Sequence, residues 1–340
     1  MENWQKHTGN SEDLVLSNRI RIARNIKGRP FPHKMNPEQA RTLVKDIEAA
    51  FFTNAHINSS YHSIHLWECD ELENERYIEK HLISTGLLQN KEGSAFIVGD
   101  DETVSLMINE EDHIRLQCIN AGFSLRESYE MANKLDDLIE ESLDYAFDER
   151  IGYITACPTN LGTGLRASAM IHLPALTMNN GMNGILKALT QMGMTIRGLY
   201  GEGSKASGNL YQVSNQITLG VSEEDIISNL EAVVNQIVNE ENNTRELLYG
   251  KYKHELEDKI FRALGILKNA VMLTSGECLD LLSNVRMGVE MGIIKDIDKS
   301  LLNNLLIVTQ PASLQVNYNT RLTEKERDIN RARLVKEALK

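Results

Sequence analysis

Several signatures of common protein classes are missing from this chain. Its four cysteines, at positions 69, 118, 157 and 278, have neither the paired spacing of a zinc site nor a compact disulfide pattern. No apolar run reaches the roughly 18 residues that a transmembrane helix needs, and the polar N-terminus lacks the apolar stretch of a signal peptide. The Gly-x-x-x-x-Gly-Lys-Ser/Thr loop that cradles phosphates in many nucleotide-binding proteins is also absent. We therefore expect a cytoplasmic protein without a membrane span, and a P-loop is excluded.

The chain has few basic residues relative to acidic ones. With 48 Asp and Glu against 36 Lys and Arg, its formal net charge is −12. Nucleic acids and anionic membranes attract basic surfaces, so this charge argues against general binding to either and favours basic protein partners. The 340 residues, of which 41% are hydrophobic and 25% charged, are typical of a globular chain of about two domains.

The most informative segment is CPTNLGTGLRAS at residues 157–168. Gly162 and Gly164 permit backbone conformations in which main-chain N–H groups approach an anion closely. Arg166 adds a permanent positive charge, and Cys157 adds a thiol at the end of a predicted strand. We expect a strand, a loop and a helix N-terminus in that order, forming a phosphate-binding turn beside a reactive sulfur. For this segment alone, a buried cysteine in an ordinary turn is the more common outcome.

Three other segments combine charged residues in a similar way. Residues 109–115 (NEEDHIR) place three adjacent acids, an imidazole and a guanidinium after a strand-like run, and adjacent acids repel one another unless a cation intervenes. Residues 197–203 (RGLYGEG) set an arginine and a carboxylate five residues apart. Residues 17–24 (SNRIRIAR) alternate arginine with aliphatic residues, so Arg19 and Arg21 share one face of a strand, although a solvated edge strand has the same pattern.

Together and in this order, these segments resemble the ATP:guanidino phosphotransferases, the family of arginine and creatine kinases. The resemblance covers residues 14–220 and ends with the segment SNQITLG at 214–220. Within the family it is strongest to the bacterial protein-arginine kinases, because the first arginine motif lies near the N-terminus and an extra C-terminal segment is present. The resemblance implies an α+β catalytic domain, with a largely antiparallel sheet flanked by helices, that transfers the ATP γ-phosphoryl group to a guanidinium.

The resemblance also implies a set of phosphate ligands. Guanidinium groups stay charged near neutral pH and match phosphate oxygens with two donors at once. Magnesium is expected on the phosphates of ATP, because the sequence offers no separate carboxylate cage for it. The nucleotide-phosphate ligands that the resemblance implies are Arg19, Arg21, Arg115, Arg166 and Arg197.

Roles on the acceptor side follow from the same resemblance. Glu111 and Glu202 clamp the acceptor guanidinium, and Glu111 is the candidate for general base. Cys157 matches the reactive cysteine of the family, whose thiolate pairs with the substrate without forming a covalent bond. His81 matches a histidine beside the adenine, although a lone helix histidine is more often a surface residue. Met170 stands where the metabolite kinases commonly have a second adenine-side histidine.

Hydrophobic periodicity predicts the surrounding structure. A helix should begin at Ser124, with Glu127 completing a capping box, and the three cysteines other than Cys157 should be buried. After residue 222 the pattern is almost wholly helical, with helix starts at Ser222, Ser275 and Thr323. We expect a catalytic domain at residues 1–250 and a small helical domain at 251–340, with the boundary at 245–255. Strands are expected at residues 95–98, 103–108, 114–119, 151–156, 194–200 and 210–219.

The C-terminal segment TEKERDINRA at 323–332 brings Arg327, Asp328 and Arg331 within about one helical turn. Alone, such a group is usually a solvated ion-pair face. The Arg-Asp-x-x-Arg-Ala pattern of the protein-arginine kinases implies a phosphoarginine-binding site, with the phosphate on the two arginines and the guanidinium on Asp328. The resemblance further implies an activator protein, a Clp-type ATPase or protease and a stress-gene repressor as partners, and a homo-oligomer such as a dimer.

The expected substrate is an arginine within a protein. Only a short stretch precedes the first arginine motif, so the acceptor site should be uncovered and should admit a polypeptide. A role in protein quality control and the stress response is implied by the resemblance alone. Two alternatives stay open: a kinase of small guanidino compounds such as free arginine, and a phosphoarginine-binding adaptor in which catalysis is secondary.

Overall fold

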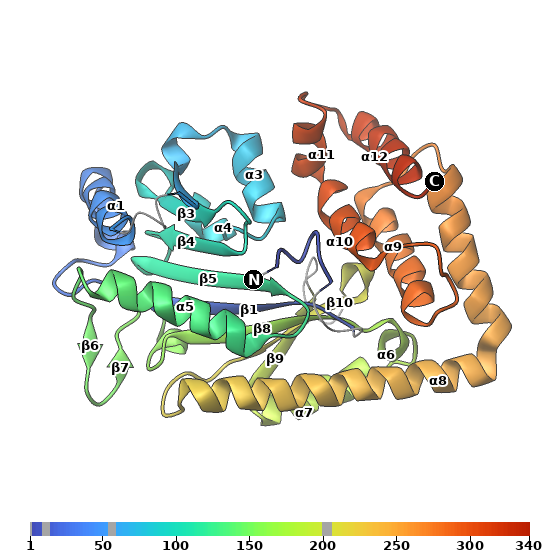
Figure 1. Ribbon diagram of the computed structural model, residues 1–340, viewed down its shortest axis with the longest axis horizontal. Helices are drawn as coiled ribbons and strands as arrows, with labels where there is room; N and C mark the ends of the chain where they lie inside the picture. Colours follow the sequence, from blue (N-terminus) through green and yellow to red (C-terminus); the bar gives the residue numbers. More distant parts are fainter. Residues whose placement is uncertain (1, 9–13, 54–58, 199–205) are drawn as a thin grey trace.

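The computed structural model describes residues 2–8, 14–53, 59–198 and 206–340. A large antiparallel sheet forms its centre, with the strand order β2-β3-β4-β5-β1-β8-β10-β9 (Figure 1). A separate two-stranded ladder joins β6 to β7. The strands are β1 (Val15–Arg24), β2 (Tyr61–His65), β3 (Ala95–Gly99), β4 (Val104–Ile108), β5 (Ile114–Ala121), β6 (Phe147–Asp148), β7 (Gly152–Tyr153), β8 (Leu165–His172), β9 (Met194–Gly198) and β10 (Leu210–Asn215).

Helices surround the sheet, as expected for an α+β fold. None of the helices in the described part of the chain combines the length and the apolar character that a membrane crossing requires. The helices are α1 (Pro37–Phe51), α3 (Glu71–Glu79), α4 (Thr85–Leu88), α5 (Leu125–Glu140), α6 (Pro174–Met178), α7 (Met182–Gln191), α8 (Glu223–Asn269), α9 (Ser275–Glu290), α10 (Lys299–Val308), α11 (Pro311–Asn317) and α12 (Glu324–Ala338).

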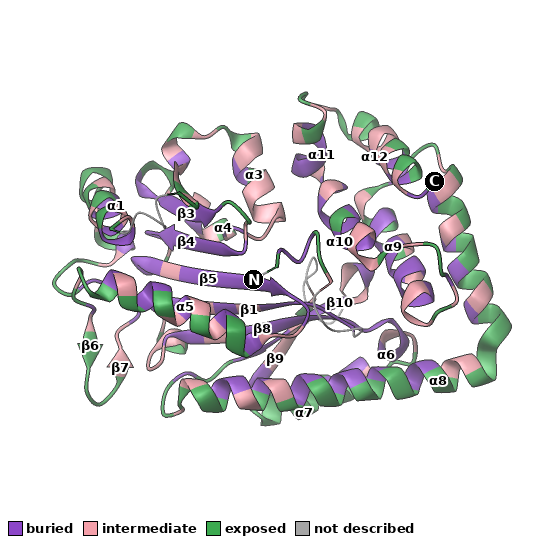
Figure 2. Cartoon of the chain, in the orientation of Figure 1, coloured by how far each residue is buried: buried purple, intermediate pink, exposed green. Residues whose placement is uncertain are grey.

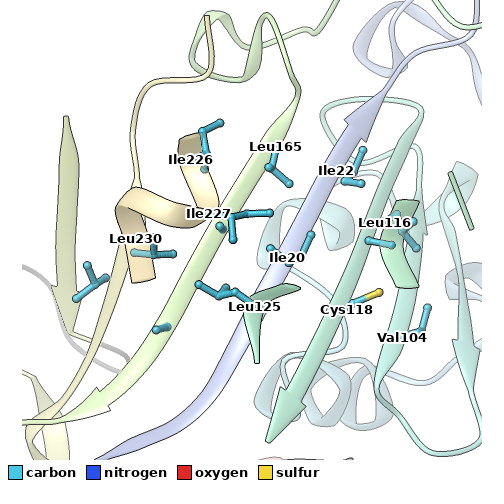
Figure 3. Close-up of a cluster of buried hydrophobic side chains, with 14 of the residues drawn as sticks. Ile20, Ile22, Val104, Leu116, Cys118, Leu125, Leu165, Ile226, Ile227 and Leu230 are labelled. Atoms are coloured by element: carbon cyan, nitrogen blue, oxygen red, sulfur yellow. The ribbon is translucent and has the colours of Figure 1, made fainter. Parts of the chain in front are cut away.

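One face of the sheet is packed against α5 and the first half of α8. The alternation of β1 directs Ile20 and Ile22 to this face, where they join Leu116 of β5 and Leu165 of β8 in one buried cluster (Figure 3). Ile226 and its neighbours on α8 enter the same cluster. The central strands are accordingly buried almost throughout (Figure 2). Arg19 and Arg21 alternate with these isoleucines and therefore belong to the opposite face, whereas Arg24 shares the isoleucine face and pairs with Asp136 of α5.

The C-terminal helices form a second core that reaches this opposite face. Leu279, Leu282 and Leu305 pack there with Trp4 and Met170, which belong to the N-terminal segment and to β8. Helices α9 to α12 gather beside the second half of α8 (Figure 1). α8 itself runs through the expected domain boundary at 245–255, with a break from helical geometry at Tyr252 (φ −133°).

Two predictions about local structure were wrong. The segment after Gly164 is strand β8 rather than a helix, because it pairs with both β1 and β10. The strand expected at 151–156 shrinks to the two residues of β7, and a 3₁₀ turn, Pro158–Asn160, follows Cys157. β2 was not foreseen. A helix dipole therefore does not contribute to the cysteine loop, and anion binding there depends on side chains.

Details of capping and burial also differ from expectation. Ser124 precedes α5, but its hydroxyl accepts hydrogen bonds from Asn18 and Asn120 instead of completing a capping box. Ser222 and Thr323 do cap their helices with complete capping boxes, whereas the cap of α9 is Thr274 and not Ser275. Of the three cysteines expected to be buried, Cys118 and Cys278 are, while Cys69 is half-buried.

Candidate active site

Arginines from four strands converge on the face of the sheet that is opposite α5. Arg21 of β1 lies directly across from Arg166 of β8, and Ala23 lies across from Arg115 of β5. Arg197 of β9 pairs with Gln212 of β10, which pairs in turn with Met170 of β8. Because directly paired residues share a face, as do residues two apart on one strand, the predicted phosphate ligands Arg19, Arg21, Arg115, Arg166 and Arg197 are all on this face.

A cavity of about 190 Å³ lies among these arginines. Its floor is the sheet, and its rim includes the loop after Cys157 and the acidic segment before β5. The lining residues that carry chemistry are Arg21, Arg115, Arg166, Glu111, Cys157 and Thr159. The cavity therefore brings the predicted acid and the predicted thiol together with three of the predicted phosphate-binding arginines.

The arginines are held close enough to weaken one another's protonation. Burial, followed by the charges of Arg115 and Arg166, lowers the pKa of Arg19 to about 9. Burial and three neighbouring arginines lower the pKa of Arg21 well below its ordinary value. Burial also lowers the pKa of Arg166, with Arg197 and Arg115 adding to the effect. An anion bound among these arginines stabilises their charged forms, because it replaces the water that burial removes.

Unused hydrogen-bond donors support the same interpretation. The Nε atoms of Arg21 and Arg166 are buried, and neither has a hydrogen-bond partner in the described structure. Leaving a buried donor unpaired costs about 1–3 kcal/mol, and more for a charged group. The Nη2 atom of Arg166 donates to the Ser214 hydroxyl at 3.3 Å. A phosphate group would supply acceptors for these free donors.

The three adjacent acids have separate environments. Glu110 forms an ion pair with Arg115 and accepts a hydrogen bond from Ser84; burial opposes its ionisation, but Arg115 dominates and its pKa is lowered. Asp112 is buried and accepts from the Asn25 amide and the Ala156 main chain, both at 2.6 Å. It thereby fixes the chain just before the cysteine. Neither carboxylate is available to an acceptor in this arrangement.

Glu111 is the acid that lines the cavity. Burial, together with the adjacent charges of Asp112 and Glu110, raises its pKa above the ordinary value of 4.5. The Cys157 thiol lines the same cavity as the Glu111 carboxylate and lies 3.0 Å from the Thr159 hydroxyl. A carboxylate with a raised pKa beside a cavity is well suited to accept a proton from a substrate nitrogen.

The two glycines of the cysteine loop allow main chains to approach each other. Gly162 has φ +109°, and a Cβ atom there would lie 2.3 Å from the carbonyl oxygen of Thr218. Gly164 has φ +65°, and its Cβ would lie 2.6 Å from the carbonyl oxygen of Ala23. The Thr218 hydroxyl donates to the carbonyls of Thr159 and Leu161. The glycines thus hold the loop against the sheet and position the thiol.

A second, smaller cavity of about 30 Å³ adjoins the first along β1 and β8. Arg19 and Met170 line it, two residues beyond Arg21 and four beyond Arg166 on the same strands. His81, which follows α3 in a left-handed conformation (φ +61°), lines it as well. Burial and then the charge of Arg19 lower the pKa of His81 to about 3, so its ring is neutral. The site therefore has one part lined by three arginines and a second part in which the other residues that line it with Arg19 are uncharged.

Comparisons with known proteins decide the family. Residues 42–244 match the family described as ATP:guanido phosphotransferase, C-terminal catalytic domain. The chain belongs to the ATP:guanido phosphotransferase family. Its residues 253–340 match a second description, the protein-arginine kinase McsB C-terminal domain.

Relatives of this guanido phosphotransferase are similar over its whole length. It is 59% identical to the protein-arginine kinase of Clostridium novyi (strain NT), covering 100% of this chain and 99% of that one. It is 46% identical to the protein-arginine kinase of Bacillus velezensis, covering 100% and 93%. The crystal structure of lombricine kinase is also similar, with a TM-score of 0.61 and 26% identity over 73% of this chain and 71% of that one.

Two of the predicted site residues, Glu202 and Arg197, are not among the described residues that line the cavity. Glu202 lies outside the described residues, and the Arg197 side chain is exposed at the edge of the sheet. In the described part of the chain, no group of three or more His, Cys, Asp or Glu side chains could hold a metal ion. Glu110 belongs to the same acidic motif as Glu111 but was not predicted as a site residue, because its ion pair with Arg115 and its hydrogen bond from Ser84 are visible only in the fold.

The predicted phosphoarginine residues lie on α12, in the helical C-terminal region. Arg331 is 1% exposed, and its guanidinium donates to the main-chain oxygens of Thr309 and Leu273 and to Asp328. Arg327 is half-buried and donates to the carbonyl of Leu322. Asp328 and Arg331 are thus adjacent as expected, but Arg331 also ties α12 to the chain before α9 and to the end of α10.

Proposed function

We propose that this protein is an ATP-dependent protein-arginine kinase, which transfers the γ-phosphoryl group of ATP to arginine side chains of proteins. The observation that carries the proposal is the cavity in which Arg21, Arg115 and Arg166 face Glu111 and Cys157. Phosphoryl transfer needs positioning and charge stabilisation more than covalent chemistry, and clustered guanidinium groups supply both. The relatives that are named protein-arginine kinases match the chain across both of its regions, which favours a protein substrate.

In the proposed reaction, the arginines bind the phosphates of ATP, and Mg²⁺ arrives with the nucleotide on the phosphate oxygens. A nitrogen of the acceptor guanidinium attacks the γ-phosphorus, and the bond from that phosphorus to the β–γ bridging oxygen breaks to leave ADP. Glu111 takes the proton that the attacking nitrogen loses. Glu202 is proposed to hold the other side of the guanidinium, and the Cys157 thiolate to pair with it.

The setting of this activity is proposed from the resemblance described above. We infer a cytoplasmic enzyme that acts in protein quality control and the stress response, as a homo-oligomer such as a dimer. An activator protein, a Clp-type ATPase or protease and a stress-gene repressor are proposed partners. The division into a catalytic domain at 1–250 and a helical domain at 251–340 belongs to the same proposal. We further propose that Arg327, Asp328 and Arg331 mark a phosphoarginine-binding site.

The decisive experiment compares a protein acceptor with a free one. Purified enzyme is incubated with MgATP and either an unfolded basic protein or free L-arginine, and products are analysed by mass spectrometry under conditions that avoid acid, which hydrolyses the P–N bond. Phosphorylated arginines are expected in the protein. Rapid phosphorylation of free arginine without modification of the protein would instead establish a small-molecule guanidino kinase. Binding of phosphoarginine without any transfer would establish an adaptor.

A matched pair of cysteine variants controls the assay. Cys157→Ala should reduce turnover strongly, because the thiol lines the cavity beside Glu111. Cys69→Ala removes a half-buried thiol that donates to the His65 carbonyl outside the cavity, and its turnover should match the wild type. Equal turnover in both variants would remove Cys157 from the proposed mechanism.

A further inference from the structure

The N-terminal segment, residues 2–8, is inserted between the catalytic sheet and the C-terminal helices. The main-chain N–H of Glu2 donates to the Asn120 side chain at 2.6 Å, and its carbonyl accepts from Ala121 N–H at 2.9 Å. The Asn3 amide donates to the carbonyl of Asp101 at 3.0 Å. In Figure 1 this dark-blue segment passes between the sheet and α10. Its position is therefore fixed by the strands that carry the site.

Trp4 directs its side chain from this segment into the smaller cavity. The indole is 3% exposed and lines the cavity together with Arg19, His81 and Met170. The rings of Trp4 and His81 have centroids 6.0 Å apart and are inclined by 35°. The indole of Trp4, the neutral imidazole of His81 and the thioether of Met170 make this cavity suited to a flat, uncharged heteroaromatic group.

Asn303 of α10 holds the main chain at Trp4 and at His7, three residues further on. Its amide nitrogen donates to the carbonyl of Trp4 at 2.8 Å and to that of His7 at 3.2 Å. Its amide oxygen accepts from the guanidinium of Arg286 on α9, which leaves the nitrogen facing the two carbonyls. Asn303 is 1% exposed, so no water competes for these bonds. The C-terminal helices thus hold one side of the cavity.

We propose that Trp4 forms a wall of the nucleobase-binding subsite, and that Asn303 positions it. The inference rests on the proposed function, because it assigns the larger cavity to the phosphates and the smaller one to the base. The order along the strands is consistent with a nucleotide: Arg19 lies in the small cavity and Arg21, two residues on, in the large one. Two strand residues span roughly 7 Å, a separation suited to a base and its phosphates.

The size of the cavity indicates how the base enters. Its volume of about 30 Å³, against about 190 Å³ for the larger cavity, has room for only a few water-sized positions, so a purine needs a rearrangement of the lining side chains. The main chain of Trp4 is held by Asn303, so the indole admits the base by rotating about its side-chain torsions and then packs against it. Removing the indole should therefore weaken binding of nucleotides that carry a base, and leave binding of bare phosphates unchanged.

The chain has two tryptophans, which makes a direct optical test possible. Trp67 lies under the guanidinium of Arg41, outside both cavities. In Trp67→Phe, Trp4 is the sole tryptophan, and MgATP should change its emission, whereas inorganic triphosphate should not. In the converse variant, Trp4→Phe, the emission of Trp67 should be unchanged by either ligand. An unchanged Trp4 emission at MgATP concentrations that saturate turnover would overturn the proposal, as would an equal response to triphosphate.

Steady-state kinetics distinguish the contribution of Trp4 to ATP binding from that of Asn303. Trp4→Ala should raise KM for ATP about tenfold with a smaller change in kcat, and Trp4→Phe should restore most of the difference. Asn303→Asp places a carboxylate against the carbonyls of Trp4 and His7, and should also raise KM for ATP. The matched control is Asn284→Asp, since Asn284 is half-buried on α9, lines neither cavity and donates to the carbonyl of Asp280 one turn before it.

Each outcome discriminates. If Trp4→Ala folds poorly, the Trp67→Phe titration still decides, because it leaves Trp4 and the second core intact. An unchanged KM for ATP in both Trp4→Ala and Asn303→Asp would overturn the inference, although the wild type would still phosphorylate protein arginine. The opposite outcome is also distinguishable. If MgATP changes the emission of Trp4 but the wild type transfers no phosphoryl group, the proposed function is wrong and the assignment of Trp4 to the nucleobase subsite still holds.

Discussion

Arg21 and Arg166 face each other directly across the ladder between β1 and β8. Like charges at directly opposed positions of a sheet are destabilising, and here burial removes the water that would screen them. Arg115 adds a third cation at the neighbouring register position. The fold therefore maintains a concentration of positive charge that a bound anion would stabilise.

Removing one of these cations should lower turnover without lowering the stability of the ligand-free protein. Arg166→Met keeps an aliphatic stem of similar length but removes the charge, so the ligand-free protein should be at least as stable as the wild type. Turnover should fall by about 10²- to 10³-fold, the cost of losing one preorganised group that stabilises transition-state charge. Urea unfolding and phosphoryl-transfer assays measure the two effects.

Arg126→Met is the control for this change, because Arg126 is half-exposed and pairs with Glu224 and Glu231 on the surface. Its turnover should equal that of the wild type. Inorganic triphosphate should raise the melting temperature of the wild type more than sodium chloride of equal ionic strength does, and it should do so less in Arg166→Met. A ligand-free Arg166→Met that is less stable by more than about 1 kcal/mol would contradict the strain argument.

Glu111 should set the acidic limb of the pH profile. Its pKa is raised above 4.5, so it becomes protonated, and unable to accept a proton, at a higher pH than an ordinary glutamate as the medium is acidified. We expect kcat/KM to decline on the acid side with a midpoint above 4.5. Glu111→Gln should reduce turnover by about 10²- to 10⁴-fold and abolish that limb.

Glu130→Gln, an exposed change on α5, should leave the profile unaltered. Retention of the acidic limb in Glu111→Gln would assign the proton acceptor to another group. The proposed role of Glu111 would then be limited to orienting the guanidinium.

The sequence predicted those parts of the site that depend on local periodicity. The alternation in residues 17–24 placed Arg19 and Arg21 on one face of a strand, because side chains of any strand alternate with a period of two. It could not predict which strands lie beside them. Gly164 was expected to precede a helix, but the residues after it pair with both β1 and β10, and such long-range pairing overrides local propensity.

Roles that arise from contacts between distant segments were likewise not predictable. Trp4 sits in a stretch that reads only as a polar N-terminus, and its place beside His81 depends on Asn303, almost 300 residues away. Arg331 reads as a surface cation on a helix, yet it satisfies carbonyls that belong to other segments. In both cases the deciding quantity is the burial of a main-chain polar group, which no local pattern records.

Gly162 should tolerate no side chain. Its φ of +109° is unfavourable for L residues, and an added Cβ would meet the carbonyl of Thr218 at 2.3 Å. Gly162→Ala should destabilise the protein by at least about 2 kcal/mol and lower turnover by displacing the cysteine loop. Gly265→Ala, inside α8 with no atom near its Cβ position, should instead stabilise by about 0.5–1 kcal/mol. Differential scanning calorimetry of both variants measures this contrast, and equal shifts would refute it.

Glu290 should be a main source of stability between the sheet and the C-terminal helices. It lies 2.9 Å from both His172 of β8 and Arg245 of α8. Burial would raise its pKa, but His172, Arg245 and Arg286 outweigh that effect and lower it to about 2. Glu290→Gln should therefore cost about 3–5 kcal/mol at pH 7, because it leaves buried cations without their counter-charge.

The pH dependence of that loss follows from the lowered pKa. A carboxylate whose pKa falls on folding contributes its full stabilisation above the unfolded value of 4.5, and loses it as the pH drops toward 2. The difference between the wild type and Glu290→Gln, measured by urea unfolding, should stay constant from pH 8 to pH 5. Glu255→Gln, on the exposed side of α8, should change stability little. Disappearance of the difference by pH 6 would show that Glu290 is not held ionised by this network.

Arg327 and Arg331 should respond differently to removal, although both belong to the proposed phosphoarginine site. Arg331→Ala strands the buried carbonyls of Thr309 and Leu273, so it should destabilise the protein by about 2–4 kcal/mol. Arg327→Ala breaks one bond to a main-chain carbonyl at 3.2 Å, so it should leave stability nearly unchanged and abolish binding of free phosphoarginine. Arg333→Ala, an exposed change on the same helix, should alter neither property. Calorimetric titration with phosphoarginine and thermal unfolding test the three variants together, and undiminished binding by Arg327→Ala would exclude α12 as the binding site.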